Sequence, residues 1–159
     1  MILDTRTTAR PHPGQSAHPV QPVRSVRPAH PVQSVRPVAA VVAGLVNDGS
    51  ALGVARVALA EAVERGGRIR FVQVVPPGLG ADQRADADEG TFHAAMVALR
   101  AHPRVRSSFE LVVGDVAETL VEHSREAGVL IVGQDDPGSA ARVADYCREH
   151  ADCEVRVVG

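Results

Sequence analysis

Residues 38–46 read Val-Ala-Ala-Val-Val-Ala-Gly-Leu-Val and are followed at 47–50 by Asn-Asp-Gly-Ser. An uninterrupted apolar run of nine residues is typical of a strand that is covered on both faces, as in a parallel sheet. The next stretch has apolar residues at helical spacing, namely Leu52, Ala55, Leu59 and Val63. Gly66-Gly67 then ends this helix. A buried strand, a polar turn and an amphipathic helix together form the first half of a βαβ unit.

The alternation of strand and helix continues to the end of the chain. Further strands are predicted at 69–75, 109–113, 129–132 and 155–158. Three further helices are predicted: one marked by Phe92, Met96 and Leu99, one from Asp115 to Gly128, and one on the stripe Ala140, Val143, Ala144 and Cys147. Residues 78–90 are rich in Gly and Asp and are interpreted as a loop. This order predicts an α/β fold with a doubly wound, Rossmann-like, five-stranded parallel sheet and helices on both faces.

The composition changes near residue 37. Residues 11–37 hold seven of the eleven prolines, and the heptapeptide that starts at His18 returns in similar form at His30. Proline lacks an amide donor and fixes φ, so this density of proline disfavours helices and central strands. Residues 1–37 are therefore predicted to be a disordered Pro/Arg-rich tail, and residues 38–159 to be the folded domain.

Composition also argues against several classes of function. The net charge of −2 disfavours a nucleic-acid-binding domain, although residues 1–40 carry +4 (five Arg, one Asp) and residues 41–159 carry −6 (twelve Arg, eighteen acidic residues). The longest apolar run is too short for a membrane helix, and the N-terminus lacks the apolar segment of a secretory signal, so we expect a cytoplasmic protein. Histidines and cysteines are scattered without metal-ligand spacing, and no catalytic constellation is recognised. The chain is therefore not expected to be an enzyme. If it has any catalytic activity, we expect that activity to be slow ATP hydrolysis.

Several short motifs lie in the same order as in one known family. These are the Val-Val-Ala-Gly-Leu-Val strand with Asn-Asp-Gly-Ser after it, then Phe71-Val-Gln-Val-Val-Pro-Pro77, Gly114-Asp-Val-Ala-Glu-Thr-Leu120, Ala127-Gly-Val-Leu-Ile-Val-Gly133, and the segment from Asp145 to Val158. Through them, residues 38–159 resemble a universal stress protein. The resemblance implies a homodimer paired through the last strand, at Val155, Val157 and Val158.

The resemblance also implies an ATP site with three parts, and this sequence departs from two of them. Val46 stands where the family has an Asp that closes the first strand, and Asp48 is the nearest substitute. Val74 occupies the second-strand position, which contacts the nucleotide through its backbone. In the family's glycine loop, Gly133 matches the first glycine and Asp136 replaces the second.

The end of that glycine loop can be placed in two ways. One alignment puts the final Gly-Ser pair of the family on Ala141-Arg142, which makes the loop five residues short. The other uses Gly138-Ser139 and needs a larger deletion. The sequence therefore favours a dimeric regulatory or interaction module that has lost ATP binding and carries no cofactor, with a possible unidentified protein partner. The alternative is an ATP-binding universal stress protein with a rearranged phosphate loop.

Overall fold

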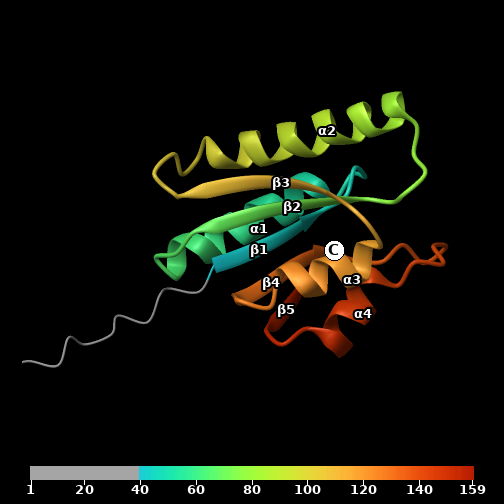
Figure 1. The fold of residues 1–159 in the computed structure, drawn as a ribbon. Coiled ribbons are helices and arrows are strands. Elements are labelled where there is room, and N and C mark those ends of the chain that lie inside the picture. The colour runs from blue at the N-terminus through green and yellow to red at the C-terminus, as the bar shows by residue number, and fades with distance from the viewer. Residues whose placement is uncertain (1–39) are drawn as a thin grey trace, which may run out of the picture. The chain divides into compact units, whose positions relative to one another are not determined.

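The structure is a computed structural model, and it describes residues 40–159. The predicted tail at 1–37 lies outside the described residues, as do Val38 and Ala39. Strands and helices alternate along the chain (Figure 1): β1 Ala40–Leu45, α1 Ala51–Glu64, β2 Ile69–Val75, α2 Ala81–Leu99, β3 Ser107–Val113, α3 Val116–His123, β4 Ala127–Gly133, α4 Val143–His150 and β5 Glu154–Val158.

The five strands form one sheet in the order β3-β2-β1-β4-β5, and all four pairs of neighbouring strands are parallel. The chain therefore winds outward from β1 in one direction to β3, and then from β4 in the other direction to β5. This arrangement confirms the predicted doubly wound parallel sheet. It leaves β3 and β5 as the two edge strands of the described sheet.

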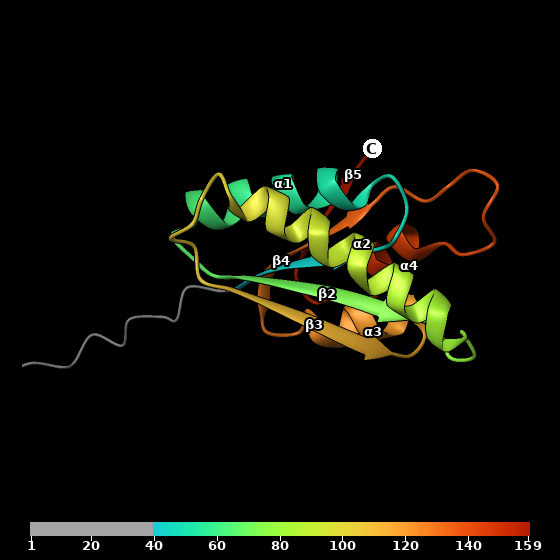
Figure 2. The ribbon, with the colours of Figure 1, turned by 90° about the horizontal axis from the view of Figure 1, so that it is seen from above.

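Helices cover both faces of the sheet, as the sequence predicts. On one face, α1 and α2 pack on a core that includes Val41, Phe71 and Ile131 (Figure 2). On the other face, α3 and α4 pack on a core that includes Leu120 and Leu130. All six residues of β1 are buried, as expected of the central strand. These two apolar layers hold the carboxyl ends of the strands at one end of the domain.

The prediction that residues 78–90 form a loop is wrong for most of that stretch, because α2 begins at Ala81. The Gly and Asp content suggested a loop, yet the segment is also rich in Ala, Gln, Arg and Glu, which favour helices. The first turn of α2 is stabilised by two hydrogen bonds between residues close in the sequence. The side-chain oxygen of Gln83 accepts a hydrogen bond from the amide of Gly80 at 3.3 Å, and Arg84 donates to the carbonyl of Leu79 at 3.3 Å.

The boundaries of α3 and α4 also differ from the prediction. The α3 helix begins as predicted after Asp115, whose carboxylate accepts a hydrogen bond from the amide of Glu118 at 3.0 Å. It ends at His123 rather than Gly128, because the chain must turn at 124–126 to enter β4. The α4 helix begins at Val143 rather than Ala140, and residues 134–142 remain without regular helix or strand.

Candidate functional site

The central strands β1 and β4 diverge into separate connections at their carboxyl ends, which is where ligands bind in doubly wound sheets. A cavity of about 340 Å³ lies at this point, bounded by the turn after β1, the loop after β4 and one side of α3. It is lined by Gly44, Val46, Asp48, Ser50, Val116, Leu120, Val132, Gly133, Gln134, Asp135, Asp136, Ser139, Ala141 and Val143. Five of the seven residues predicted for the site, namely Val46, Asp48, Gly133, Asp136 and Ser139, therefore meet around one cavity.

The polar groups in the turn after β1 form hydrogen bonds with one another. Val46 follows the last residue of β1 and is exposed, so an apolar side chain stands at the mouth of the cavity. Asp48 accepts hydrogen bonds from the amide of Ser50, at 2.8 Å, and from its hydroxyl group. This Asx turn leads into α1, and its Asp-x-Ser pattern is a signal that the sequence analysis missed. Asp48 thus organises the turn and does not occupy the position of Val46.

The loop after β4 begins at a close contact with this turn. A Cβ atom on Gly133 would lie 2.8 Å from the hydroxyl oxygen of Ser50, so glycine permits the approach of β4 to the start of α1. Two residues later, Asp135 reaches across to the N-terminus of α4. Its carboxylate accepts hydrogen bonds from the amide of Ala144, at 2.9 and 3.1 Å, and from the amide of Asp145 at 3.3 Å.

The amides at a helix N-terminus are the groups that bind phosphate in many nucleotide sites. In this chain a carboxylate nine residues upstream already occupies two of them. This long-range cap also explains why α4 begins at Val143, since the bonded amides belong to its first turn. Only the folded loop brings Asp135 to these amides, which follow it by nine and ten residues in the sequence.

The remainder of the loop is also bonded internally. The amide of Ser139 donates to the carbonyl of Asp136 at 3.0 Å, which closes a turn through Gly138. The Ser139 hydroxyl accepts a hydrogen bond from the amide of Ala141 at 3.1 Å. Asp136 and Ser139 border the cavity, whereas Gly138 is not among the residues that line it.

Val74, the predicted backbone contact on β2, is also outside the cavity lining. Its side chain is buried in the core beneath α3 and α4, and in the sheet it pairs with Val112 of β3. The structure therefore does not bring Val74 to the cavity between β1 and β4.

A second, larger cavity of about 790 Å³ lies beside the first. Val116, Ala141 and Val143 line both cavities. The larger one extends past Pro76 and Pro77 at the end of β2 and past Tyr146 on α4. Four carboxylates and one guanidinium face it, from Asp115, Glu118, Asp145, Glu149 and Arg142. This excess of negative charge does not favour binding of a phosphate group.

Other chemically versatile side chains lie apart from the two cavities. Cys147 is fully buried against the second core, and burial raises the pKa of its thiol to about 11, so it acts as a small apolar residue. Cys153 is half-buried against the same core. Within residues 40–159, no three His, Cys, Asp or Glu side chains are grouped to hold a metal ion. The same residues include no helix with the length and apolar character to cross a membrane.

Comparison with solved structures identifies the fold. A universal stress protein from Archaeoglobus fulgidus in complex with dAMP is 21% identical, with a TM-score of 0.63 over 77% of this chain and 98% of that one. A universal stress protein in complex with cAMP is also 21% identical, with a TM-score of 0.60 over 76% of this chain and 96% of that one. A universal stress protein family member from Burkholderia pseudomallei is 24% identical, with a TM-score of 0.58 over 77% and 97%.

These likenesses cover nearly the whole length of the compared chains, so the chain has the universal stress protein fold. No protein-family model matches the sequence, and a search of curated proteins finds no match either.

Proposed function

We propose that this chain is a regulatory or interaction module of the universal stress protein family whose phosphate-binding groups are occupied by its own Asp135. One observation carries the proposal: the Asp135 carboxylate accepts hydrogen bonds from the first-turn amides of α4. A triphosphate at this helix end must displace that carboxylate or lie beside it. Repulsion between two unit charges about 4 Å apart costs on the order of 1 to 4 kcal/mol.

Two further features act in the same direction. The amides of Ser139 and Ala141 are bonded within the loop, so they are not free to surround a phosphate. Val46 offers no polar atom in its side chain at the position where the family has Asp. Each weakening of 1.4 kcal/mol is tenfold in affinity, so a micromolar site becomes weaker by roughly a hundredfold or more. We therefore expect no resident cofactor and no enzymatic turnover, whereas slow ATP hydrolysis would accompany the alternative function.

The alternative function is nucleotide binding with a rearranged phosphate loop. The cavity of about 340 Å³ at the ends of β1 and β4 supports it, because its size falls within the range of small-molecule sites. Two solved structures of the same fold are described as complexes with dAMP and cAMP, and a third, from Arabidopsis thaliana, as having AMP bound. In this reading the nucleotide would lie with its phosphates away from Asp135.

Calorimetric titration with ATP and AMP separates the two functions. For the wild-type chain we expect no saturable binding at a nucleotide concentration of about 10⁻⁴ M. Asp135→Asn, which removes the charge but can still accept a hydrogen bond, should permit weak ATP binding. Asp136→Asn is the comparison, because it removes one charge from the same cavity without changing the hydrogen bonds to the α4 amides, and its effect on ATP binding should be smaller than that of Asp135→Asn. Saturable ATP binding to the wild type would overturn the proposal in favour of the alternative.

A second substitution tests the loop itself. Val46→Asp restores the missing carboxylate of the first strand but leaves the loop amides bonded as they are. We expect this single change to restore no ATP binding in the same titration. Restored binding would mean that the short loop still receives phosphate at Gly138 and Ser139.

The proposed module acts as a homodimer that is paired through β5. The support is that β5 is an edge strand with β4 as its partner in the described sheet, and an unpaired edge favours association. An antiparallel pair about a two-fold axis at Val155 would place Glu154 opposite Arg156 of the second copy, and Cys153 opposite its Val157. Opposite charges in directly opposed positions stabilise such a pair, whereas an axis at Arg156 would oppose two like charges.

Light scattering tests this dimer. Val157→Pro removes an amide and should convert the β5-paired dimer into monomers, with the circular dichroism spectrum unchanged. Val63→Asp is the control, because Val63 is exposed on a side of α1 other than the one that meets β5 through Glu61, and it should not change the mass. A wild-type monomer at micromolar concentration, or a dimer that survives Val157→Pro, would exclude pairing through β5.

A further inference from the structure

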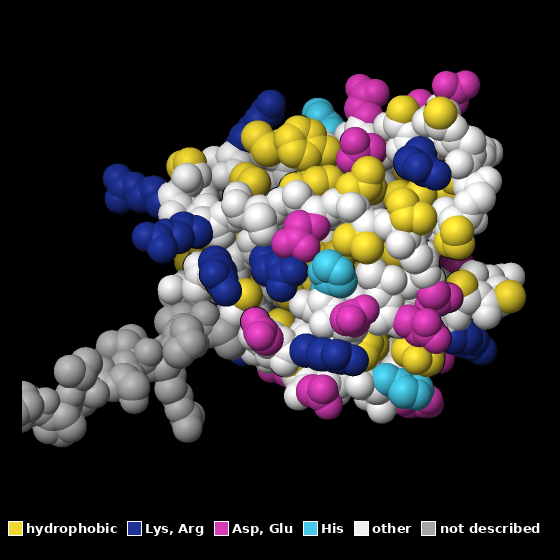
Figure 3. All heavy atoms as spheres, viewed as in Figure 1, with side chains coloured by type: hydrophobic (Ala, Val, Ile, Leu, Met, Phe, Trp, Pro, Cys, Tyr) yellow, Lys and Arg dark blue, Asp and Glu magenta, His cyan; other side chains and the backbone are white. Residues whose placement is uncertain are grey.

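The outer side of α2 and β3 carries an exposed apolar surface. Phe92 and Met96 on α2 are 48% and 44% exposed, and Leu111 and Val113 on β3 are 42% and 53% exposed. These four residues define what we call the α2–β3 surface. Figure 3 shows apolar side chains running across this side of the molecule. None of these four residues lines either of the two cavities described above.

The apolar residues belong to one continuous stripe. Phe109, Leu111 and Val113 alternate along β3 and so share one face of the sheet. Phe109 packs against the α1–α2 core, and its ring meets that of Phe92 edge to face, with 5.2 Å between the ring centres. The stripe therefore begins at the edge of the core under α2 and continues outward over Leu111 and Val113.

Charges of opposite sign lie at the two ends of the surface. Where β3 begins, Arg100, Arg104 and Arg106 are exposed and carry +3. Where α2 begins and β3 ends, residues 82–89 hold four acidic residues and one Arg, a charge of −3. Figure 3 shows basic side chains gathered on the left and acidic ones at the upper right of the same side. A surface of this pattern is complementary to itself when it is rotated by two-fold symmetry.

The sequence of β3 also matches itself in one antiparallel register. With a two-fold axis at Leu111, Leu111 opposes Leu111 of the second copy, and Phe109 opposes its Val113. These are pairs between large apolar side chains, and aromatic with β-branched pairs stabilise antiparallel strands. An axis at Glu110 would instead oppose two glutamates. The register at Leu111 also directs the basic end of one copy toward the acidic end of the other.

We propose that the α2–β3 surface binds a second copy of this chain, with the two β3 strands antiparallel about a two-fold axis at Leu111. The contact is independent of nucleotide binding and of pairing through β5. Phe92 and Met96 fill the space between the two α2 helices beside the paired strands. Because β3 and β5 are opposite edges of one sheet, a chain that uses both contacts assembles beyond the dimer.

Disulfide crosslinking tests the register directly. Directly opposed residues of an antiparallel pair have Cβ atoms about 4.5–5.5 Å apart, which small strand movements bring within disulfide reach. Leu111→Cys in the full chain should therefore form a covalent dimer under mild oxidation. Val63→Cys is the matched control, since Val63 is exposed to a similar extent at the far end of α1 and should not crosslink.

Sedimentation over roughly 1 to 100 µM tests the association itself. Leu111→Asp opposes two like charges and should weaken assembly through β3 by roughly a hundredfold, while Val63→Asp leaves it unchanged. Arg104→Glu with Arg106→Glu should also weaken it, and adding Asp82→Arg with Asp86→Arg should restore it. Circular dichroism checks that each variant is folded.

Three outcomes would overturn the proposal. One is a wild-type chain that has the mass of a monomer at every concentration. A wild-type dimer that Val157→Pro converts fully into monomers counts as the same outcome, because such a dimer forms through β5 alone. Another is Leu111→Asp with the mass of the wild type. The third is equal crosslinking of Leu111→Cys and Val63→Cys.

Discussion

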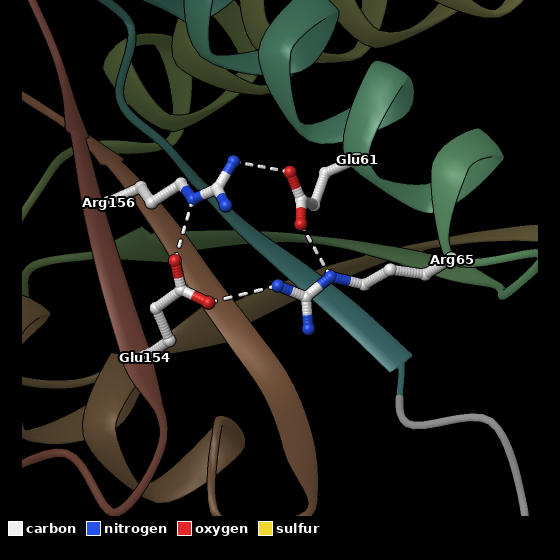
Figure 4. Close-up of polar contacts among 4 residues, drawn as sticks. All are labelled: Glu61, Arg65, Glu154 and Arg156. Carbon is white, nitrogen blue, oxygen red and sulfur yellow. Dashed lines mark hydrogen bonds and ion pairs between the residues drawn. The ribbon is translucent and has the colours of Figure 1, made fainter.

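The sheet has two edge strands, β3 and β5, and they expose different kinds of side chain. The β5 strand turns Glu154 and Arg156 toward α1, where they form a ring of four ion-paired residues with Glu61 and Arg65 (Figure 4). The β3 strand instead exposes Leu111 and Val113. Charged side chains discourage unselective pairing of an edge, whereas apolar ones favour it.

The difference follows from how the helices cover each edge. The α1 helix reaches β5 through Glu61, which is 5% exposed and contacts both Arg65 and Arg156. At the other edge, α2 buries its small residues Thr91, Ala94, Ala95 and Ala98 and leaves Phe92 and Met96 outward. One edge is therefore held to its helix by charge, and the other presents a surface that is complementary to a second copy.

The largest effect should come from the residue that joins the apolar stripe of β3 to the core. Phe109→Ala removes a partly buried ring and its edge-to-face contact with Phe92. We expect the free energy of unfolding to fall by about 2 to 3 kcal/mol in urea titrations. Leu111→Ala on the same face should change it by less than about 0.5 kcal/mol when the urea titration is done at a protein concentration too low for assembly through β3, because that side chain is exposed in the single chain. Equal losses would mean that the stripe is uniformly buried.

At the β5 edge, the buried carboxylate should matter most. Glu61→Gln leaves the exposed Glu154 as the remaining anion between the guanidinium groups of Arg65 and Arg156, and should lower the free energy of unfolding by about 1 to 2 kcal/mol. Glu64→Gln, one helical turn away and exposed, is the control. A neutral effect of Glu61→Gln in urea titrations would show that charge does not hold β5 to α1.

Lowering the pH should reduce the stability of the protein by protonating Glu110 on β3. The guanidinium of Arg70, which donates two hydrogen bonds at 3.1 and 3.0 Å, holds the pKa of this carboxyl below its ordinary value, with a smaller contribution from His123. The unfolded chain therefore binds more protons, so this contribution is fully present above a pH of about 4.3 and is lost as pH falls through the lowered pKa. Glu110→Gln should flatten that part of the stability–pH curve, and an unchanged slope would contradict the pairing.

The smallest effect should come from the exposed half of the ion-paired ring. The guanidinium groups of Arg156 and then Arg65 lower the pKa of Glu154, but the carboxyl lies in solvent, which weakens both interactions. Glu154→Gln should reduce thermal stability less than Glu61→Gln does, and the difference from wild type should disappear at high salt. A salt-independent loss would indicate that the side chain is buried in solution.

The sequence determined the order and type of the elements, because period and apolar run length are local properties. The run that contains β1, the glycines after α1 and the capping Asp115 each predict their own segment. Similar reasoning failed for the start of α2, where Gly and Asp outweighed a high content of helix-forming residues. The helical spacing of Phe92 and Met96 correctly predicted the second half of α2. These two side chains do not form its buried face, however, because the structure leaves them exposed.

Tertiary structure alone decided which groups of the site are free to act. The sequence placed Val46, Asp48, Gly133, Asp136 and Ser139 near one cavity, since strand ends of a parallel sheet meet at one side. It did not pair Asp135 with the amides of α4, nor match the two ends of the α2–β3 surface by charge. Those relations depend on the path of a loop and on the face by which a helix packs, and both are set by contacts between residues distant in the chain.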